Sequence, residues 1–214
     1  MTVRFSAMDF DVFTIAGFTE RMDAIRRQIR PKLATVGEQL TPWLEHETGL
    51  EFYYHVATHA RRRVNPPDDT WVAFSRSARG YKRYIHLAVA IDRMGLKTEL
   101  VVKPELDDRS VFAERLARLG IQGMARLLGK DGTPVYWYDG REGGLPVSAM
   151  SEADFQQILE SLQSKKSAGA ALSCRLPKEE VLDWEPPLMI NTLRQHLIRL
   201  VPLYVLPFEM PSST

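Results

Sequence analysis

Residues 70–103 read TWVAFSRSARGYKRYIHLAVAIDRMGLKTELVVK, and their hydrophobic pattern decides the fold class. Residues 70–76 form a run rich in aromatic and β-branched side chains, and apolar side chains then alternate through residues 85–91. Alternation with a period of two is typical of a strand with one buried face. A third strand is predicted at residues 96–103, after a turn at residues 92–95. These runs therefore predict an antiparallel hairpin beside a further strand.

The turn at residues 92–95 decides which side chains of the hairpin share a face. An even number of loop residues places the apolar side chains of both strands on one side. These residues are Ile85, Leu87, Val89, Ile91, Leu96, Thr98, Leu100 and Val102. The opposite side then carries Lys82, Tyr84, His86, Ala88 and Ala90 beside Lys97, Glu99 and Val101, so small residues can floor a groove. We expect Trp71 and Phe74 to join the core, covered by the helix that bears Met22, Ile25 and Ile29.

Several helices are expected around these strands. Apolar residues three or four apart predict helix at residues 19–47, as two helices or one kinked helix, with Pro31 as the interruption and Gly49 as the end. Ser110 is the expected N-cap of residues 111–119, and Gly120 and Gly123 weaken the continuation. Later come a strand at 134–138, a helix capped by Ser151, a strand at 171–176 and a helix from Pro186 to Pro202.

The composition is that of a soluble globular protein. The 214 residues are 44% hydrophobic and 26% charged, and they fit one α+β domain over residues 1–214, with a mainly antiparallel central sheet, helices packed against it and a disordered tail at 206–214. The single cysteine, Cys174, excludes an intrachain disulfide and is expected to be buried. No apolar run is long enough to span a membrane, and the amino-terminal residues do not form a signal peptide. We therefore expect a cytoplasmic protein without a membrane partner.

The charge distribution singles out residues 55–86. This segment carries seven positive side chains, at Arg61, Arg62, Arg63, Arg76, Arg79, Lys82 and Arg83, against Asp68 and Asp69. The whole chain has 28 Lys and Arg residues against 27 Asp and Glu, so the positive charge is concentrated here. An anionic partner is the functional interpretation, and a solvated face or a structural ion-pair network is the structural alternative. Three consecutive arginines cannot all point one way, so at most two of Arg61–Arg63 converge on one ligand.

The candidate ligand-binding residues are His59, Arg61, Arg62, Arg79, Tyr81, Lys82 and His86. Aromatic and basic residues together suit stacking on a nucleobase, although aromatic residues more often complete a core. His55 and His59 are four apart and could share a metal on a helix, but the residues between them lack the glutamate of a zinc protease, so no metal site or cofactor is predicted. His59 and His86 remain candidates for a general base or a pH switch.

Several stretches are similar to the YktB-like family of uncharacterised bacterial proteins. They are residues 9–15 (DFDVFTI), 31–33 (PKL), 55–57 (HVA), 59–62 (HARR), 64–74 (VNPPDDTWVAF) and 79–82 (RGYK), followed later by 150–162 and 177–180. The sequence departs from the family pattern at Thr58, at Arg63 and at Ile85-His86-Leu87. The resemblance implies a single-domain α+β fold and a cytoplasmic protein, with no established activity.

Three functions remain open from the sequence. The first is a noncatalytic module that binds a phosphate-bearing ligand, either a phosphorylated small molecule such as a nucleotide or a short RNA segment. The second is an enzyme acting on a phosphorylated substrate, with His59 or His86 as acid or base and the arginines stabilising developing charge. The third is a protein-interaction domain whose basic face meets an acidic surface. No motif fixes a reaction, and the oligomeric state is left undetermined by the sequence.

Overall fold

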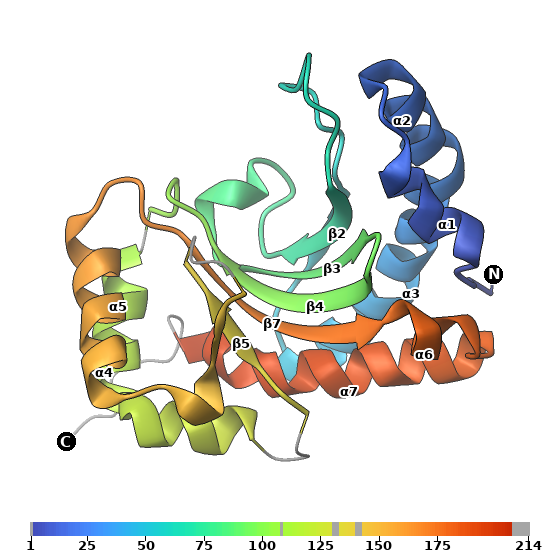
Figure 1. Cartoon of the computed structure of the whole chain (residues 1–214). Helices are drawn as coiled ribbons and strands as arrows, with labels where there is room; N and C mark the ends of the chain where they lie inside the picture. Colours follow the sequence, from blue (N-terminus) through green and yellow to red (C-terminus); the bar gives the residue numbers. More distant parts are fainter. Residues whose placement is uncertain (1, 108, 130–132, 140–142, 207–214) are drawn as a thin grey trace.

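An antiparallel sheet of seven strands forms the centre of the protein in the computed structural model (Figure 1). The structure describes residues 2–107, 109–129, 133–139 and 143–206. Within these ranges the strand order is β1-β2-β3-β4-β7-β5-β6. The strands are β1 (Tyr53–Val56), β2 (Asp69–Ser75), β3 (His86–Asp92), β4 (Gly95–Val102), β5 (Tyr136–Tyr138), β6 (Leu145–Pro146) and β7 (Ala170–Pro177). Every pairing is antiparallel, which confirms the predicted α+β class.

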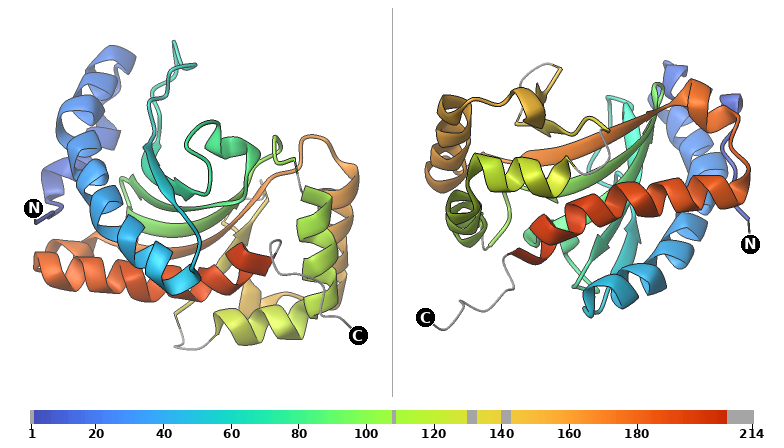
Figure 2. Two further views of the ribbon diagram at one scale, coloured as in Figure 1. Left: turned by 180° about the vertical axis from the view of Figure 1, so that it is seen from behind. Right: turned by 90° about the horizontal axis from the view of Figure 1, so that it is seen from below.

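Helices cover one side of the sheet and border its far end. They are α1 (Ala7–Asp11), α2 (Phe18–Ala24), α3 (Arg30–Thr48), α4 (Arg109–Leu128), α5 (Glu152–Ser164), α6 (Lys178–Leu182) and α7 (Pro186–Val205), with 3-10 turns η1 (Val12–Thr14), η3 (Tyr81–Arg83) and η4 (Val147–Ala149) and a π turn η2 (Ile25–Ile29). Helices α3 and α7 lie beneath the sheet, and α4 and α5 lie beside its β5 end (Figures 1 and 2). The opposite, concave face is bordered by the loop between β1 and β2 and by η3.

The β3–β4 hairpin has the register that the sequence predicts. Asp92 pairs with Gly95 across a two-residue turn, Leu87 pairs with Leu100, and Ile91 pairs with Leu96. These four apolar side chains are at most 1% exposed and lie in one hydrophobic core. Gly95 has a φ of 142°, and a Cβ there would lie 2.1 Å from the carbonyl oxygen of Leu176 in β7. Glycine therefore allows β7 to approach the turn closely.

Two expectations about the concave face are wrong. Strand β3 begins only at His86, because Gly80 adopts a φ of 67° and starts the 3-10 turn η3, so Lys82 and Tyr84 do not lie on the strand. Trp71 is half-buried on the concave face instead of joining the core. The physical reason is alternation along β2, which sends Val72 and Phe74 into the core and Trp71 to the other side.

The amino-terminal helical region forms one helix across Pro31, which is one of the two alternatives predicted for residues 19–47. Residues 18–48 are helical throughout, through the π turn η2, and Gly49 ends α3 in the left-handed conformation as predicted. Pro31 is the second residue of α3 and has no N–H to donate, and the π turn that ends two positions before it changes the hydrogen-bond pattern at this point of the helix. The helical contacts with β1 and β2 come mainly from α3, whose Leu33 and Leu40 are fully buried. The helix that bears Met22, Ile25 and Ile29 thus covers the sheet through its α3 part, and these three side chains lie in the same hydrophobic core.

The carboxy-terminal half contains the predicted elements, with β6 and α6 in addition and with differences at two helix ends. The capping box of Ser151 and Asp154, the break of α4 at Gly120 and the burial of Cys174 are confirmed. Helix α4 begins at Arg109, so Ser110 is not its N-cap, and α7 continues through Pro202 to Val205. Of the tail predicted at 206–214, Leu206 accepts a hydrogen bond from Arg115, and residues 207–214 lie outside the described ranges.

Leu87→Ala tests the assignment of the core. The side chain of Leu87 is fully buried between the sheet and its helices, so truncation should lower the free energy of unfolding by about 2–5 kcal/mol. The measurement is urea denaturation followed by circular dichroism. Leu188→Ala is the matched control, because Leu188 is 51% exposed on α7 and its truncation should change stability little. Equal effects of the two substitutions would contradict the core described above.

Candidate functional site

The concave face of the sheet has a floor of small side chains. Cross-strand pairing joins Ala73 to Ala88, and it joins Glu99 to both Ala88 and Ser173, while Ala171 pairs with Val101. These residues lie on the same face because side chains alternate along each strand. Two adjoining cavities lie over this face and share Arg62 and Trp71 in their linings. We call them the sheet cavity and the loop cavity.

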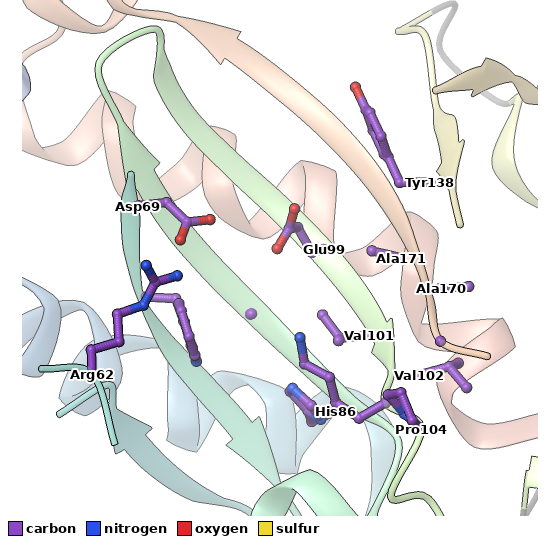
Figure 3. A pocket seen from close by; sticks show the side chains of 14 residues that line it. Arg62, Asp69, His86, Glu99, Val101, Val102, Pro104, Tyr138, Ala170 and Ala171 are labelled. Carbon is purple, nitrogen blue, oxygen red and sulfur yellow. The ribbon is translucent and has the colours of Figure 1, made fainter. Parts of the chain in front are cut away.

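The sheet cavity lies directly over the alanine floor and has a volume of about 420 Å³. Its lining includes Arg62, Asp69, Trp71, His86, Ala88, Glu99, Val101, Lys103, Tyr138 and Ala171. Figure 3 shows Asp69 of β2 and Glu99 of β4 facing the hollow across β3, with Arg62 on one side and His86 at the other end. Carboxylates and cations therefore meet in one cavity, which is less purely basic than the sequence suggested.

The loop cavity lies between the β1–β2 loop and η3 and has a volume of about 980 Å³. It is lined by His55, Val56, Ala57, Thr58, His59, Ala60, Arg61, Arg62, Trp71, Gly80, Tyr81, Lys82, Arg83 and Glu105. Four of these side chains are cationic and one is a carboxylate. The hairpin loop and the 3-10 turn thus bring together basic residues about twenty positions apart, and the loop cavity is the more basic of the two.

The structure brings together most of the residues that the sequence predicts for a site. His59, Arg61, Arg62, Tyr81 and Lys82 line the loop cavity, while Arg62 and His86 line the sheet cavity. Arg79 lines neither cavity and is exposed. Two of the three consecutive arginines converge, as expected, and the third, Arg63, donates to the carbonyl oxygen of Ala60 at 2.9 Å. Part of the basic segment therefore converges on the two cavities, whereas Arg63 and Arg79 do not line them.

Several of the remaining charges in the basic segment have structural partners. Arg83 binds Asp107 with a closest distance of 2.8 Å, although it also lines the loop cavity. The guanidinium of Arg76 lies 5.3 Å from the ring centroid of Tyr84, which is a cation–π contact. Among the described residues, Arg61, Arg62 and Lys82 have no carboxylate within ion-pair distance. Of the four cations that line the loop cavity, these three are therefore the ones left to meet an anion.

An aromatic cluster joins the two cavities. Tyr81 stacks on His55 with ring centroids 5.0 Å apart and meets the edge of His86 at the same distance. Trp71 donates from Nε1 to the Tyr81 hydroxyl at 3.0 Å. Burial raises the pKa of Tyr81, so its hydroxyl stays protonated at neutral pH. The cluster therefore holds Trp71 in the wall that the two cavities share.

His86 is a neutral hydrogen-bond acceptor at the end of the sheet cavity. It is 1% exposed, and burial lowers its pKa to about 4, with nearby Lys103 acting in the same direction. Its Nδ1 lies 2.9 Å from the carbonyl oxygen of Tyr84. Because a carbonyl only accepts, Nδ1 carries the proton and Nε2 has a bare lone pair. No hydrogen bond to Nε2 is formed by the described residues.

His59 has an unusual backbone at the mouth of the loop cavity. Its φ of 51° is the one positive value outside glycine in the described ranges, and such conformations are strained and recur at functional sites. Its Nε2 lies 3.1 Å from Thr70 Oγ1, and its ring meets the edge of Trp71. Burial lowers the pKa of His59, and neighbouring Arg62 and Lys82 lower it further while Asp69 opposes them. His59 is therefore neutral at physiological pH.

A chain of ion pairs borders the sheet cavity. Lys97 Nζ lies 3.2 Å from Asp69, 3.6 Å from Asp92 and 3.8 Å from Glu99. Arg175 adds a two-pronged pair to Asp92, with both distances 2.9 Å. Burial by itself would lower the pKa of Lys97, but the surrounding carboxylates raise it, so Lys97 stays charged. This network neutralises part of the acidic charge and fixes the positions of Asp69 and Glu99.

The two histidines considered for a metal are not on one helix face. His55 lies in strand β1 and its Nε2 is 2.8 Å from the carbonyl oxygen of Ser77, while His59 lies in the following loop. Within the described ranges no group of three or more His, Cys, Asp and Glu side chains is arranged to hold a metal ion.

Sequence reasoning missed Lys103 and Tyr138 as lining residues. Residues 99, 101 and 103 are spaced two apart, and side chains at this spacing share one face of a strand. The sequence therefore already indicates that Lys103 lies on the same face as Glu99 and Val101.

Sequence comparisons connect the chain to proteins that have no assigned role. A family described as "Domain of unknown function (DUF1054)" matches residues 5–204. Similar proteins named UPF0637 occur in Bacillus mycoides (35% identity, covering 94% of this chain and 96% of the relative), Bacillus cereus (36%, 96% and 99%) and Exiguobacterium sibiricum (33%, 95% and 98%). These matches confirm the resemblance to uncharacterised bacterial proteins. A solved structure from Pyrococcus furiosus is similar with a TM-score of 0.42, 10% identity and coverage of 86% of this chain and 98% of that one, which is too weak to support an argument.

The pKa of His86 predicts a pH dependence of stability. In the unfolded chain this histidine takes up a proton near pH 6.5, whereas in the fold it stays neutral down to about pH 4. Stability is therefore complete above pH 6.5 and falls as the pH is lowered toward 4, by roughly 3 kcal/mol at most. Urea denaturation at several pH values should show a shallower loss for His86→Asn than for the parent. His46→Asn, at an exposed histidine, is the control and should keep the parent's slope; an unchanged slope in His86→Asn would contradict the assignment.

Proposed function

We propose that this chain, which belongs to the DUF1054 family of proteins of unknown function, binds a phosphate-bearing ligand in the loop cavity and leaves it chemically unchanged. The ligand class is a nucleotide or a short RNA segment. The observation that carries the proposal is the convergence of Arg61, Arg62 and Lys82 on one cavity. Each of the three comes from a loop or turn that the sheet holds in place, on either side of the same hollow.

Charge supports this assignment. Arginine presents several N–H groups in a fixed fork that suits phosphate oxygens, and lysine adds a compact charge. The described carboxylates lie beyond ion-pair distance of the three side chains, so binding an anion there breaks no existing ion pair. Arg62 is held only loosely, with NH1 3.5 Å from the carbonyl oxygens of Asn65 and Pro66. It is free to turn toward a ligand in either cavity.

The size of the basic surface favours a small ligand over duplex nucleic acid. The net charge of the chain is +1, and nonspecific duplex binding draws on an extended basic face. The loop cavity is local and lies beside the rings of Trp71 and Tyr81. Aromatic rings next to phosphate-binding cations suit one nucleotide or a few unpaired bases.

One observation favours catalysis as a second candidate. The bare Nε2 of His86 lies in the wall of the sheet cavity, and a neutral histidine is the form that accepts a proton as a general base. Arg62 would then stabilise negative charge developing on a phosphorylated substrate. Turnover that depends on His86 would distinguish this candidate from simple binding.

No helix in the described ranges is both long and apolar enough to cross a membrane. We propose a cytoplasmic location, which the single cysteine supports, and fractionation of cells that express the chain tests this proposal.

Arg62→Ala and Lys82→Ala test the binding site. Calorimetric titration with pyrophosphate and with nucleoside diphosphates should show that each substitution weakens binding by about 1.5–3 kcal/mol, the range for hydrogen bonds to charged groups. Added salt should weaken the parent's binding as well, since exposed charges are screened. Arg79→Ala is the matched control, because Arg79 belongs to the same basic segment but lines neither cavity. The proposal fails if none of these ligands binds, or if Arg79→Ala weakens binding as much as Arg62→Ala.

Recovered ligand separates binding from catalysis. After prolonged incubation with the parent protein, a chromatographic assay should return every nucleotide unchanged. Conversion that is lost in His86→Ala, with binding retained, would instead establish the enzyme candidate.

A further inference from the structure

Hydrogen-bond acceptors surround the flat floor of the sheet cavity. Glu99 and Asp69 contribute carboxylates, and His86 contributes the bare lone pair of Nε2. The side chain of Glu99 is 17% exposed, and its one ion-pair contact among the described residues is the long one to Lys97 at 3.8 Å. His86 is more deeply buried and faces the same hollow (Figure 3). The cavity is thus built to receive donors.

Carboxylates are unsuitable neighbours for a phosphate group, because like charges repel. The two cavities therefore suit different parts of one ligand, with the anionic part in the loop cavity and a donor-bearing part in the sheet cavity. Arg62 and Trp71 line both cavities, so a single ligand can extend from one into the other past these side chains.

The donor-bearing part fits a planar ring better than an ammonium group. Lys97 already occupies the position between the three carboxylates where an ammonium ion would lie. The floor consists of Ala88, Ala171 and Val101, whose short apolar side chains leave room for a ring to lie flat. Trp71 and Tyr138 flank that floor from β2 and β5. Lys103, whose Nζ lies 6.0 Å from the Trp71 ring centroid, adds one donor to the lining.

We propose that the sheet cavity selects a guanine base, so that the ligand of this protein is a guanine nucleotide. This inference rests on the proposed function, in which the phosphates lie in the loop cavity. Guanine presents N1–H and the exocyclic N2 amino group side by side, and the two oxygens of the Glu99 carboxylate can accept from both. Its O6 accepts from Lys103. Adenine has an acceptor nitrogen beside its amino group, which would face the carboxylate unfavourably, and hypoxanthine lacks the amino group.

A panel of four ligands tests the choice of base on the unmodified protein. Calorimetry compares GDP, IDP, ADP and pyrophosphate at one salt concentration. GDP should bind about tenfold or more tightly than IDP and ADP, in line with the discrimination expected of a two-pronged contact to a base edge. Glu99→Gln should remove most of that preference and leave the affinity for pyrophosphate unchanged. Glu160→Gln, on the exposed face of α5, is the matched control and should behave like the parent.

The outcomes separate this inference from the proposed function. Equal affinities for GDP, IDP and ADP, together with Arg62-dependent binding of pyrophosphate, would overturn the guanine assignment and leave phosphate binding intact. A preference for GDP that persists in Glu99→Gln would also overturn it, since the base would then be read elsewhere. Failure of pyrophosphate and every nucleotide to bind would remove both proposals together.

Discussion

Asp92 and Gly95 close the β3–β4 hairpin over two residues, and the rest of the molecule depends on that pairing. Because side chains alternate along a strand, this register sends Leu87, Val89 and Ile91 into the core on the side that α7 covers. A slip of one residue would exchange the two faces and expose the core. Gly95 also leaves the space in which β7 passes close to the turn, so the register and the position of β7 are linked. The Arg175–Asp92 ion pair adds a second link between the turn and β7.

The same register creates the surface on which the cavities lie. Ala88 faces away from the core between Ala73 of β2 and Glu99 of β4, so two small side chains lie beside a carboxylate on this face. The sheet thus supplies a rigid floor with fixed carboxylates, and the β1–β2 loop and η3 supply the cations. Ion pairs with Lys97 hold the carboxylates of Asp69 and Glu99, whereas Arg61 and Lys82 lie on the segments that connect the strands. This arrangement suits a ligand whose negatively charged end binds the cations and whose other end is recognised by the carboxylates.

Local pattern predicted the parts of this arrangement that depend on neighbours in the chain. The two faces of the hairpin, the cap at Ser151 and the break at Gly120 all follow from residues within a few positions of one another. The aromatic character of Trp71 suggests a core residue, but the structure places it on the concave face. Val72 and Phe74 point into the core, so the alternation along β2 already indicates that Trp71 points to the other side.

Long-range pairing explains what the sequence did not reveal. Strand β7 lies between β4 and β5, which places Ala171 and Tyr138 at the sheet cavity from segments far from residues 55–86. The convergence of Arg61, Arg62 and Lys82 was predictable because the chain returns through β2, but the exclusion of Arg79 was not. The conformation of Gly80 and the turn after it decide which of these cations reaches the cavity, and residue type alone does not encode that direction.

The central claim is that the cations of the β1–β2 loop and η3 form one phosphate-binding site. A crystal structure of the protein grown with pyrophosphate tests it most directly. We expect pyrophosphate in the loop cavity, with its oxygens within hydrogen-bond distance of at least two of Arg61, Arg62 and Lys82. Pyrophosphate bound elsewhere, or a loop cavity left open to solvent in the crystal and still without it, would show that these cations do not form a phosphate-binding site.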